Sequence, residues 1–285
     1  MLRIAVPNKG ALSEPAAALL HEAGYQHRGT AKELVVVDAE NGVELFYLRP
    51  RDIAVYVGSG TVDVGITGED MLLDSRTPYE TLLPLDFARS TFRFAGPAGS
   101  ELTVSDLAGK RIATSYENLV QDHLASRGID ADVVHLDGAV ESAIRLGIAD
   151  VIADVVETGT TLRQAGLEPF GDAIMTSQAV LFARPDADPD EQTAAALGVL
   201  LRRIRSVLVA RQYVLLDYDI PTELVDRAVT VTPGFEAPTV SPLHGGDWSA
   251  VRVMVEQRLA HKLMDELYEV GARAILVTEI RSCRI

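Results

Sequence analysis

The first part of the chain alternates short apolar runs with stretches whose apolar residues recur at helical spacing. Residues 2–6 have the composition of a buried strand, and residues 12–23 form a helical pattern that ends at Gly24. The same rhythm predicts strands at 34–37, 43–48 and 64–67 and a helix at 51–58, with the turn pair Asn41-Gly42 between two of the strands. This alternation predicts an open, mostly parallel sheet with helices on its faces.

A second run of elements begins near Thr91. The apolar pattern predicts strands at 92–95, 110–114, 133–136, 151–155 and 180–183, and helical segments at 105–107, 119–127 and 140–146. A polar stretch at 184–191, RPDADPDE, has the composition of a solvated loop. A long helix with a continuous apolar stripe follows at 192–210.

The last seventy or so residues change rhythm. Their pattern predicts, in order, a strand, a helix, two strands, a helix and a strand, at 213–218, 221–228, 238–241, 251–255, 259–270 and 274–280. The order βαββαβ is that of a ferredoxin-like module. Such a small sheet usually buries its open face against another subunit or domain. We therefore expect this module to take part in assembly with another subunit or domain.

Composition narrows the class of protein. The chain has 285 residues, of which 47% are hydrophobic and 24% charged, which is ordinary for a globular protein of two or three domains. A formal net charge of −15 argues against nucleic acid or an anionic membrane as partner. With no apolar run long enough for a signal peptide or a membrane span, and with Cys283 as the single cysteine, the sequence favours a reducing, cytoplasmic setting.

The strongest chemical signal is the run 151–162, in which a hydrophobic strand ends at Asp154 and a loop rich in Thr and Gly follows. Strand ends in α/β sheets open onto the ligand crevice, and Gly159 lets the backbone approach an anion closely. Successive N–H groups and three hydroxyls are suited to phosphate oxygens. Taken alone, the run is equally compatible with a strand followed by a polar turn. The negative net charge means that a phosphate site here depends on backbone groups, a few Lys or Arg side chains and a divalent cation.

Four further side chains are candidates, each with an ordinary alternative. Lys9 precedes a helix in a Gly-bearing loop, where a cation suits a phosphate, but it is also compatible with an exposed surface lysine. Arg49 follows an apolar strand and precedes a proline, a position for a phosphate contact or for a solvated strand end. Asp70 is placed to serve the site or simply to cap a helix that starts near residue 71. Tyr116 follows a strand and is suited to stack on a purine, although it is equally compatible with a half-buried aromatic.

Taken together, the spaced residues of this region form one linked pattern: Glu141, Gly147, Ala149, Ile152, Asp154, Val155, Thr158, Gly159, Thr161 and Leu162. The pattern resembles the signature of the ATP phosphoribosyltransferase family in its long form. The blocks at 6–12 (VPNKGAL), 46–53 (FYLRPRDI) and 65–70 (GITGED) are similar to further blocks of that family. The C-terminal module resembles the regulatory domain that distinguishes the long form from the short form.

The resemblance implies a fold and a reaction. The expected fold is α/β, with two lobes arranged as in periplasmic binding proteins and a C-terminal ferredoxin-like regulatory domain. Lobe I would comprise residues 1–90 and 180–211, lobe II residues 91–179, and the regulatory domain residues 212–285, with the chain crossing back near Val180. The expected reaction joins N1 of the adenine of ATP to C1 of phosphoribosyl pyrophosphate, releases pyrophosphate and opens histidine biosynthesis, with feedback inhibition by histidine. The family also suggests a homo-oligomer, from dimer to hexamer, and Mg²⁺ as cofactor.

The same resemblance assigns residues to roles. Binding of the phosphoribosyl donor is expected at Asp154, Val155, Thr158, Gly159, Thr160 and Thr161. Binding of ATP is expected at Lys9, Gly10, Leu12, Arg49, Asp70 and Tyr116, with Lys9 and Arg49 also catalytic. Glu141 and Asp154 are the expected Mg²⁺ ligands, with a contact to the ribose of the donor as the open alternative. The histidine effector is expected at Asp219, Thr239 and Ala274, although the sequence hardly separates Asp217 from Asp219.

Three alternatives stay open at the level of sequence. A two-lobed, non-enzymatic ligand-binding protein fused to an amino-acid sensor would share this architecture, but it explains residues 141–162 poorly. A phosphoribosyltransferase that uses another base would keep the donor loop and change only the acceptor pocket. The C-terminal module would, in the simplest alternative, only mediate assembly.

Overall fold

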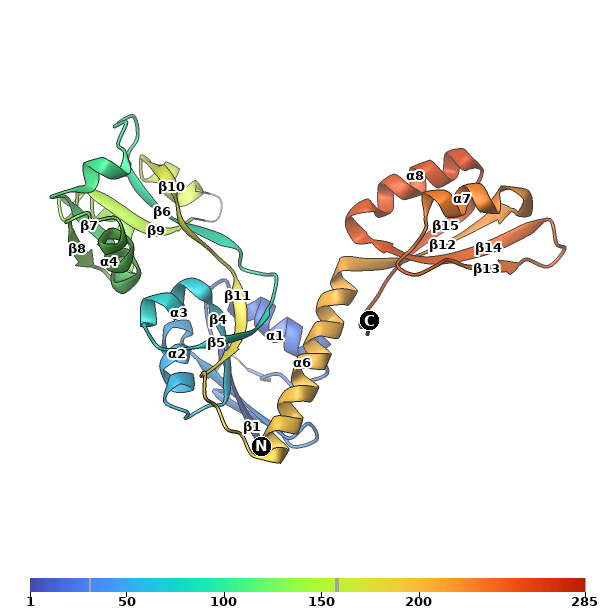
Figure 1. Ribbon diagram of the computed structural model, residues 1–285, viewed down its shortest axis with the longest axis horizontal. Coiled ribbons are helices and arrows are strands. Elements are labelled where there is room, and N and C mark those ends of the chain that lie inside the picture. Colours follow the sequence, from blue (N-terminus) through green and yellow to red (C-terminus); the bar gives the residue numbers. More distant parts are fainter. Residues whose placement is uncertain (31, 157–158, 285) are drawn as a thin grey trace. The chain divides into compact units, whose positions relative to one another are not determined.

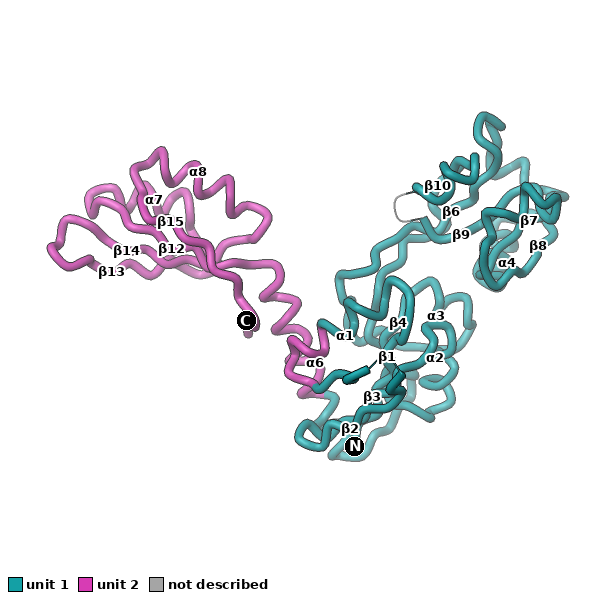
Figure 2. The backbone as a smooth tube through the Cα atoms, turned by 180° about the vertical axis from the view of Figure 1, so that it is seen from behind, with its two compact units in different colours: residues 1–18, 26–197 teal, residues 19–25, 198–285 magenta. Residues whose placement is uncertain are grey.

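The computed structural model describes residues 1–30, 32–156 and 159–284. Its contacts divide the chain into two compact units, residues 1–18 with 26–197 and residues 19–25 with 198–285 (Figure 2). The first unit holds two sheets and the second holds one. Among the described residues, no helix combines the length and the apolar character needed to cross a bilayer.

The first sheet has six strands in the order β2-β3-β1-β4-β11-β5 (Figure 1). Strands β3, β1 and β4 are parallel to one another, and β2, β11 and β5 are each antiparallel to their neighbours. The elements of this lobe are β1 (Leu2–Pro7), α1 (Ser13–Glu22), β2 (Val35–Asp38), β3 (Val43–Leu48), α2 (Pro50–Gly58), β4 (Val64–Gly68), α3 (Glu69–Ser75), β5 (Glu80–Pro84) and β11 (Ala179–Ala183).

Helix α2 packs closely on strand β4. This packing holds in place the start of α2, which the candidate residue Arg49 immediately precedes. Pro50 occupies the first turn of α2, where its missing N–H costs no hydrogen bond. Ile53 and Val57 are buried on the face that packs on the sheet. A Cβ atom on Gly65 would lie 2.5 Å from a methyl group of Ile53, so only glycine permits this approach.

The second sheet has five strands in the order β10-β6-β9-β7-β8. Strands β8, β7 and β9 are parallel, and β6 and β10 are antiparallel additions. Its elements are β6 (Ser90–Pro97), η1 (Val104–Leu107), β7 (Arg111–Thr114), α4 (Glu117–Ser126), β8 (Asp132–His135), η2 (Val140–Ser142), β9 (Val151–Val156), α5 (Thr160–Gln164) and β10 (Leu167–Ser177). Phe92 and Phe94 on β6 are fully buried against β7, β9 and α4.

The chain crosses between these two sheets twice. It leaves the first sheet after β5 and returns from β10 into β11, which lies between β4 and β5. The two crossing segments are hydrogen bonded to each other: the N–H of Leu85 donates to the carbonyl of Ala179, and the N–H of Ala179 donates to the carbonyl of Phe87, each at 3.0 Å. The chain thus returns to the first sheet at β11 (Ala179–Ala183), close to the predicted crossing near Val180.

The C-terminal unit holds a four-stranded antiparallel sheet in the order β13-β14-β12-β15. Its chain order is β12 (Tyr213–Pro221), η3 (Thr222–Leu224), α7 (Val225–Val231), β13 (Thr239–Pro242), β14 (Trp248–Glu256), η4 (Gln257–Leu259), α8 (Ala260–Val270) and β15 (Arg273–Glu279), preceded by the long helix α6 (Glu191–Gln212). Alternate residues of β12 are buried beneath α7 and α8, which cover one face (Figure 1). This strand order and βαββαβ sequence confirm the predicted ferredoxin-like module.

Several local predictions were wrong. The first sheet is mixed rather than mostly parallel, because the hairpin β2–β3 and the returning strand β11 add antiparallel pairings. Residues 140–146 form one short 3₁₀ turn and further turns instead of a helix, with the left-handed Ala139 just before it. The predicted loop after residue 159 begins a helix, α5, and the eleven-residue strand β10 was not predicted at all.

The two-lobed α/β arrangement with a ferredoxin-like module is confirmed by the sheet orders. The predicted boundaries at residues 90, 180 and 212 stay predictions. All strands of the first sheet lie within 2–84 and 179–183, and all strands of the second lie within 90–177.

Candidate active site

The predicted donor loop surrounds a cavity of about 260 Å³ in the first unit. Strand β9 is buried up to Ala153 and becomes partly exposed from Asp154. Gly159 adopts a left-handed conformation (φ 69°) and precedes the first residue of α5, so the chain turns sharply around the cavity. The cavity is lined by Glu141, Asp154, Val155, Val156, Gly159, Thr160, Thr161 and Leu162.

These lining residues include every predicted donor-binding residue that the structure describes. Glu141 reaches the same cavity from η2, thirteen residues before Asp154 in the chain. The predicted residue Thr158 lies outside the described residues. Glu141 and the described donor-binding residues, which were predicted from the spacing of the motif, thus line the same cavity.

Asp154 is electrostatically strained in this cavity. Burial raises the pKa of its carboxyl group from 3.8 to about 6, even though the backbone N–H of Val155 donates a hydrogen bond to it at 2.8 Å. The negative charges of Glu141 and Asp70 add to the rise, whereas Arg51 opposes it. A cation or a hydrogen-bond donor brought by a ligand would relieve this strain.

The donor set of this cavity fits a magnesium ion bound together with a substrate. Glu141 and Asp154 supply two carboxylates to one cavity, and the charge of Glu141 contributes to the raised pKa of Asp154. Mg²⁺ commonly uses one or two carboxylates and completes its octahedron with water and substrate phosphates. Within residues 1–30, 32–156 and 159–284, no group of three or more His, Cys, Asp or Glu side chains is arranged to hold a metal, so the protein alone offers no complete cage.

The first lobe presents cations at one edge of its sheet. Parallel strands β1 and β3 end side by side, with Pro7 opposite Leu48, and the N–H of Asn8 donates to the carbonyl of Leu48 at 2.8 Å. Lys9 and Arg49 follow these strand ends directly, and both are exposed. Neither forms an ion pair with a residue that the structure describes.

The two other predicted residues of this edge have backbone and packing roles. Gly10 adopts a left-handed conformation (φ 75°) in the loop before α1, and its carbonyl accepts a hydrogen bond from the N–H of Ser13. Leu12 is buried, with 6% of its surface exposed. The structure therefore brings Lys9, Gly10 and Arg49 to one edge, while Leu12 packs into the lobe.

Asp70 is a buried acceptor rather than a helix cap. Helix α3 begins at Glu69 after Gly68, so Asp70 lies inside its first turn, with 5% of its surface exposed. The hydroxyl of Ser177 donates to Oδ1 of Asp70 at 2.7 Å, and the N–H of Asp70 donates to Oγ of Ser177 at 3.1 Å. The charge of Asp70 also acts on the hydroxyl of Tyr116, whose pKa it raises. One carboxylate thereby links α3 of the first lobe with the segment that crosses between the lobes and lies near the loop after β7 of the second.

Tyr116 is enclosed on several sides. Burial, followed by the charge of Asp70, raises the pKa of its hydroxyl above the usual range. Its ring meets Phe92 edge-on, with centroids 5.0 Å apart, and the guanidinium of Arg51 lies 4.2 Å from the ring centroid. Arg51 also pairs with Asp74 at 3.0 Å and donates to Ser115 Oγ at 3.1 Å. A purine can stack on this ring only if Arg51 moves off it.

Sequence reasoning missed Arg51 and Ser177 as site residues. Arg51 lies within block 46–53, which is similar to the family, so it could have been predicted as a site residue from the sequence. Ser177 gave none, because its partner Asp70 is 107 residues away in the chain.

The predicted effector residues lie on the sheet of the C-terminal unit. Asp219 pairs in register with Arg273, and the pairing of β12 with β15 shifts between Asp217 and Asp219. Ala274 lies in this bulge with a left-handed backbone (φ 48°). Thr239 lies on β13, beyond β14, in the row of Asp217 instead of the row of Asp219. The structure thus brings Asp219 and Ala274 together and places Thr239 two strands away from them.

The two aspartates of β12 differ in their partners. Asp217 forms an ion pair with Arg252 at 2.7 Å, whereas Asp219 forms none with a described residue. Asp219 is therefore the more available carboxylate for an incoming ammonium group.

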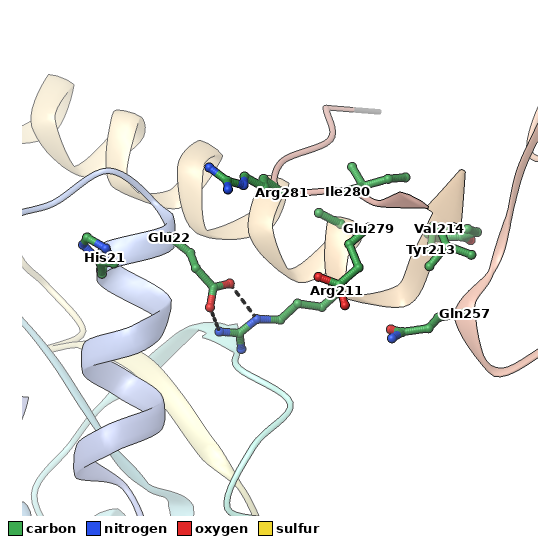
Figure 3. Close-up of a pocket in the computed structure, with 10 residues that line it drawn as sticks. His21, Glu22, Arg211, Tyr213, Val214, Gln257, Glu279, Ile280 and Arg281 are labelled. Carbon is green, nitrogen blue, oxygen red and sulfur yellow. Dashed lines mark hydrogen bonds and ion pairs between the residues drawn. The ribbon is translucent and has the colours of Figure 1, made fainter. Parts of the chain in front are cut away.

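A larger cavity, of about 590 Å³, lies in the C-terminal unit and includes no predicted residue. Figure 3 shows Glu22 and Arg211 pointing toward each other in it, and their two hydrogen bonds are each 3.0 Å long. Because this central pair is mutually satisfied, the better candidate for the chemistry is the smaller cavity, whose carboxylates Glu141 and Asp154 form no ion pair with a described residue.

Comparison with known proteins identifies the family of this chain. A family model described as ATP phosphoribosyltransferase matches residues 49–206, and one described as the C-terminal domain of HisG matches residues 210–282. Proteins named ATP phosphoribosyltransferase from Streptomyces coelicolor and Pseudarthrobacter chlorophenolicus are 62% and 61% identical to this chain, each over 100% of both chains. Among solved structures, a chain of the ATP phosphoribosyl transferase (HisG:HisZ) complex from Thermotoga maritima is similar with a TM-score of 0.63 and 28% identity, covering 73% of this chain and 98% of that one.

Proposed function

The chain belongs to the ATP phosphoribosyltransferase family, and we propose that the cavity bounded by Glu141, Asp154 and residues 159–162 is its phosphoribosyl-donor site. As a member of this family it is a pentosyltransferase that joins N1 of the adenine of ATP to C1 of phosphoribosyl pyrophosphate. The reaction releases pyrophosphate and is the first step of L-histidine biosynthesis. The observation that carries the site assignment is that six of the ten signature residues line one cavity: Glu141, Asp154, Val155, Gly159, Thr161 and Leu162.

The reaction asks little covalent chemistry of the protein. N1 of adenine carries a lone pair and forms the new bond to C1, while the C1–O bond breaks and its electron pair leaves with pyrophosphate. No activated side-chain nucleophile is needed, which agrees with an inventory of carboxylates, hydroxyls and cations at the site. Catalysis then depends on holding both substrates in line and on stabilising the charge that develops on the leaving group.

The residues of the donor cavity divide this work. The backbone N–H groups and hydroxyls around Gly159, Thr160 and Thr161 would hold the 5′-phosphate of the donor. Asp154 and Glu141 would hold Mg²⁺, which supplies charge neutralisation for the pyrophosphate. The raised pKa of Asp154 supports this role, because a divalent cation offsets the repulsion among the carboxylates.

Lys9 and Arg49 would bind anionic phosphate groups at the edge of the first lobe. Both are exposed cations without an ion-pair partner among the described residues, so binding a phosphate breaks no existing pair. Gly10 leaves the backbone of this loop open to close approach by the ligand. These cations would increase the rate by stabilising the negative charge that develops on the departing pyrophosphate.

Adenine would bind against Tyr116 after an exchange of partners. Arg51 leaves the ring face, the purine takes its place, and Phe92 keeps the ring fixed through its edge-on contact. The exchange replaces a cation–π contact by aromatic stacking, two interactions of similar strength.

The C-terminal module would bind histidine as a feedback inhibitor. Asp219 offers a carboxylate for the ammonium group, and the bulge at Ala274 leaves backbone groups outside the sheet pairing for the carboxylate of the effector. Thr239 lies two strands away from Asp219, so it would contact the effector only if the effector lies across the exposed face of the sheet. A role in assembly alone is the second candidate, and the open sheet face supports it as well.

The proposal extends to the setting of the enzyme. We expect a cytoplasmic homo-oligomer, from dimer to hexamer, with no nucleic acid or membrane partner. The relative of known structure is described as a complex with HisZ, whereas this chain carries its own C-terminal module.

One assay tests the activity directly. The purified protein is mixed with ATP, phosphoribosyl pyrophosphate, Mg²⁺ and a pyrophosphatase, and the ultraviolet spectrum of N1-substituted adenine is followed. We expect the spectral change to require both substrates and to be suppressed by histidine. A pure, folded sample that produces no change would reject the activity. Repeating the assay with another base or nucleotide in place of ATP then shows whether the protein is a phosphoribosyltransferase with a different acceptor.

A further inference from the structure

Helix α4 of the second lobe begins without a capping side chain of its own. Its N-cap position is occupied by Tyr116, whose side chain forms no capping hydrogen bond within the described chain. Tyrosine is not a helix-capping residue, because its hydroxyl lies too far from the backbone to reach the first N–H groups of the helix. The N–H groups of this first turn are therefore open to an acceptor from another part of the molecule.

The acceptor comes from the first lobe. Oδ1 of Asp74, in the last turn of α3, accepts a hydrogen bond from the backbone N–H of Leu119 at 3.2 Å. Leu119 is the third residue of α4, and the N–H at this position is one that an N-cap carboxylate normally binds. The negative charge also suits the positive end of the helix dipole. Asp74 thus caps α4 from the opposite lobe, 45 residues away in the chain.

Neighbouring contacts hold Asp74 in this position. The side-chain amide of Asn118 donates to the backbone carbonyl of Asp74 at 2.8 Å. Oδ2 of Asp74 pairs with Nη1 of Arg51 at 3.0 Å, and the side chain of Asp74 is only 13% exposed. One turn earlier on α3, Met71 packs against the apolar core of the second lobe. Both carboxylate oxygens of Asp74 are therefore engaged, in a contact from which most water is excluded.

A second polar contact between the same parts of the two lobes is of a different kind. Arg76, just after α3, pairs with Asp122 on α4 through hydrogen bonds of 2.5 and 3.2 Å. These two side chains are 49% and 59% exposed. Exposed ion pairs contribute little, because water screens the charges and two long side chains lose conformational entropy. We therefore expect the contact of Asp74 to hold the lobes more strongly than this exposed pair does.

The location of the cap connects it to the reaction. The capped turn directly follows Tyr116, against which adenine would bind, and the donor cavity is lined by residues of the same lobe. Lys9 and Arg49, the cations that would bind phosphate, lie in the other lobe. The two substrates react only when groups of both lobes are correctly placed, and a misplacement of about 1 Å can slow a reaction by about 10²-fold.

We propose that Asp74 is a positioning residue, which sets the approach of the two lobes by capping α4 of the second lobe from α3 of the first. The proposal rests on the transferase activity proposed above. It gives Asp74 no contact with a substrate, because the carboxylate acts through the N–H of Leu119.

Substitutions of Asp74 separate the cap from the charge. Asp74→Asn keeps a good N-cap acceptor without the charge, whereas Asp74→Glu keeps the charge and moves its oxygens by one methylene group. Asp74→Asn should keep kcat within about 2-fold of wild type, and both Asp74→Glu and Asp74→Ala should lower kcat by about 3- to 30-fold. An active Asp74→Glu beside an impaired Asp74→Asn would assign the effect to the ion pair with Arg51 and overturn the cap, as would wild-type kcat in all three variants.

Ligand binding distinguishes positioning from damage to the second lobe. Ribose 5-phosphate is the fragment of the donor that would occupy only the cavity lined by second-lobe residues. Its affinity, measured by titration calorimetry, should be the same in wild type and in all three variants of Asp74. A loss of affinity that follows the loss of kcat would contradict a positioning role. The matched control is Asp122→Ala, which removes the exposed pair and should keep both kcat and affinity within about 2-fold.

The separation of the lobes is measured without turnover. Spin labels are attached at Glu40→Cys in the first lobe and Asp130→Cys in the second, both exposed, in a Cys283→Ser background diluted with unlabelled chains. Double electron–electron resonance should give a broader and longer distance distribution in Asp74→Ala and Asp74→Glu than in wild type and Asp74→Asn. If Asp74→Ala does not fold, as judged by its thermal midpoint, Asp74→Glu provides the comparison.

The two proposals fail in different ways. Identical distance distributions in wild type and the variants would overturn the cap alone, whatever the activity of the enzyme. A wild type that forms no product, but whose lobes separate when the cap is removed, would defeat only the proposed activity.

Discussion

The two lobes of the catalytic unit hold their charged site residues in opposite states. The first lobe presents Lys9 and Arg49 as exposed cations without ion-pair partners among the described residues. The second lobe holds Asp154 in a cavity where burial and neighbouring carboxylates raise its pKa to about 6. An exposed cation costs the empty enzyme almost no stability, whereas a buried, uncompensated carboxylate does. The cavity of the second lobe therefore carries electrostatic strain, and the exposed edge of the first lobe does not.

The largest expected effect is the loss of activity in Asp154→Asn. Removing the charge deletes a metal ligand and a preorganised electrostatic group, so kcat/KM should fall by about 10²- to 10³-fold. The matched control is Asp188→Asn, in an exposed loop, which should retain wild-type activity. Steady-state kinetics at saturating Mg²⁺ measures both, and equal losses in the two variants would contradict the role of Asp154.

The same substitution should stabilise the empty enzyme. The folded state raises the pKa of Asp154 from 3.8 to about 6, so it binds this proton more tightly than the unfolded chain does. Its contribution therefore becomes destabilising as pH rises from about 4 to about 6 and stays so above that window. Asp154→Asn should raise the free energy of unfolding by up to about 3 kcal/mol at pH 7.5 and by much less at pH 4.

Thermal or urea unfolding without substrates or Mg²⁺ measures this gain, with Asp188→Asn again as control. A variant that is less stable than wild type at pH 7.5 would show that Asp154 is structurally required and would remove the contrast between the lobes.

A smaller effect on activity is expected from Arg49→Ala and Lys9→Ala. Each deletes one charge-assisted contact to a phosphate group, which should lower kcat/KM by about 10- to 30-fold. Both side chains are exposed, so the free energy of unfolding should change by less than about 0.5 kcal/mol. Kinetics across ionic strength gives a further measurement, because wild type should lose affinity for its anionic substrates with added salt more steeply than either variant. A large loss of stability in these variants would place the cations in the fold and not in the site.

The smallest expected effect concerns the half-exposed aspartates of the C-terminal unit. Asp219→Asn should weaken inhibition by histidine about 3- to 10-fold and leave uninhibited turnover unchanged, because its carboxylate has no ion-pair partner among described residues. Asp217→Asn, which breaks the pair with Arg252, serves as the matched control and should retain inhibition. Inhibition curves at fixed substrate decide between them. If the two variants lose inhibition equally, the choice of Asp219 is wrong.

Sequence reasoning recovered the features that are encoded locally. Strand β9 was predicted because a buried apolar run ends at a carboxylate, and every described donor-binding residue predicted after it lines one cavity. The ferredoxin-like module followed from the order of its elements. Strand β10 was missed because its sequence, LEPFGDAIMTS, includes Pro169 and Gly171 and its pairing with β6 is interrupted between Phe170 and Met175.

Features that depend on distant residues could not be predicted. The bond between Ser177 and Asp70 joins positions 107 residues apart, and the cover of Arg51 over Tyr116 depends on how the lobes meet. The mixed direction of the first sheet arises from β11, which follows the whole second lobe in the chain. The local pattern of β11 is that of any buried strand, so it specifies neither its direction nor its neighbours.

The position of β11 also sets a condition on biosynthesis. Among the described strands, β5 pairs only with β11, and β11 lies between β4 and β5. A nascent chain that has emerged only as far as β6 therefore has an incomplete first sheet, with the edge of β4 open and β5 without its partner. Nearly a hundred further residues must leave the ribosome before the missing strand arrives. Translational pauses in this interval would prolong the exposure of the unpaired edge of β4. Unpaired strand edges of this kind bind chaperones and promote aggregation.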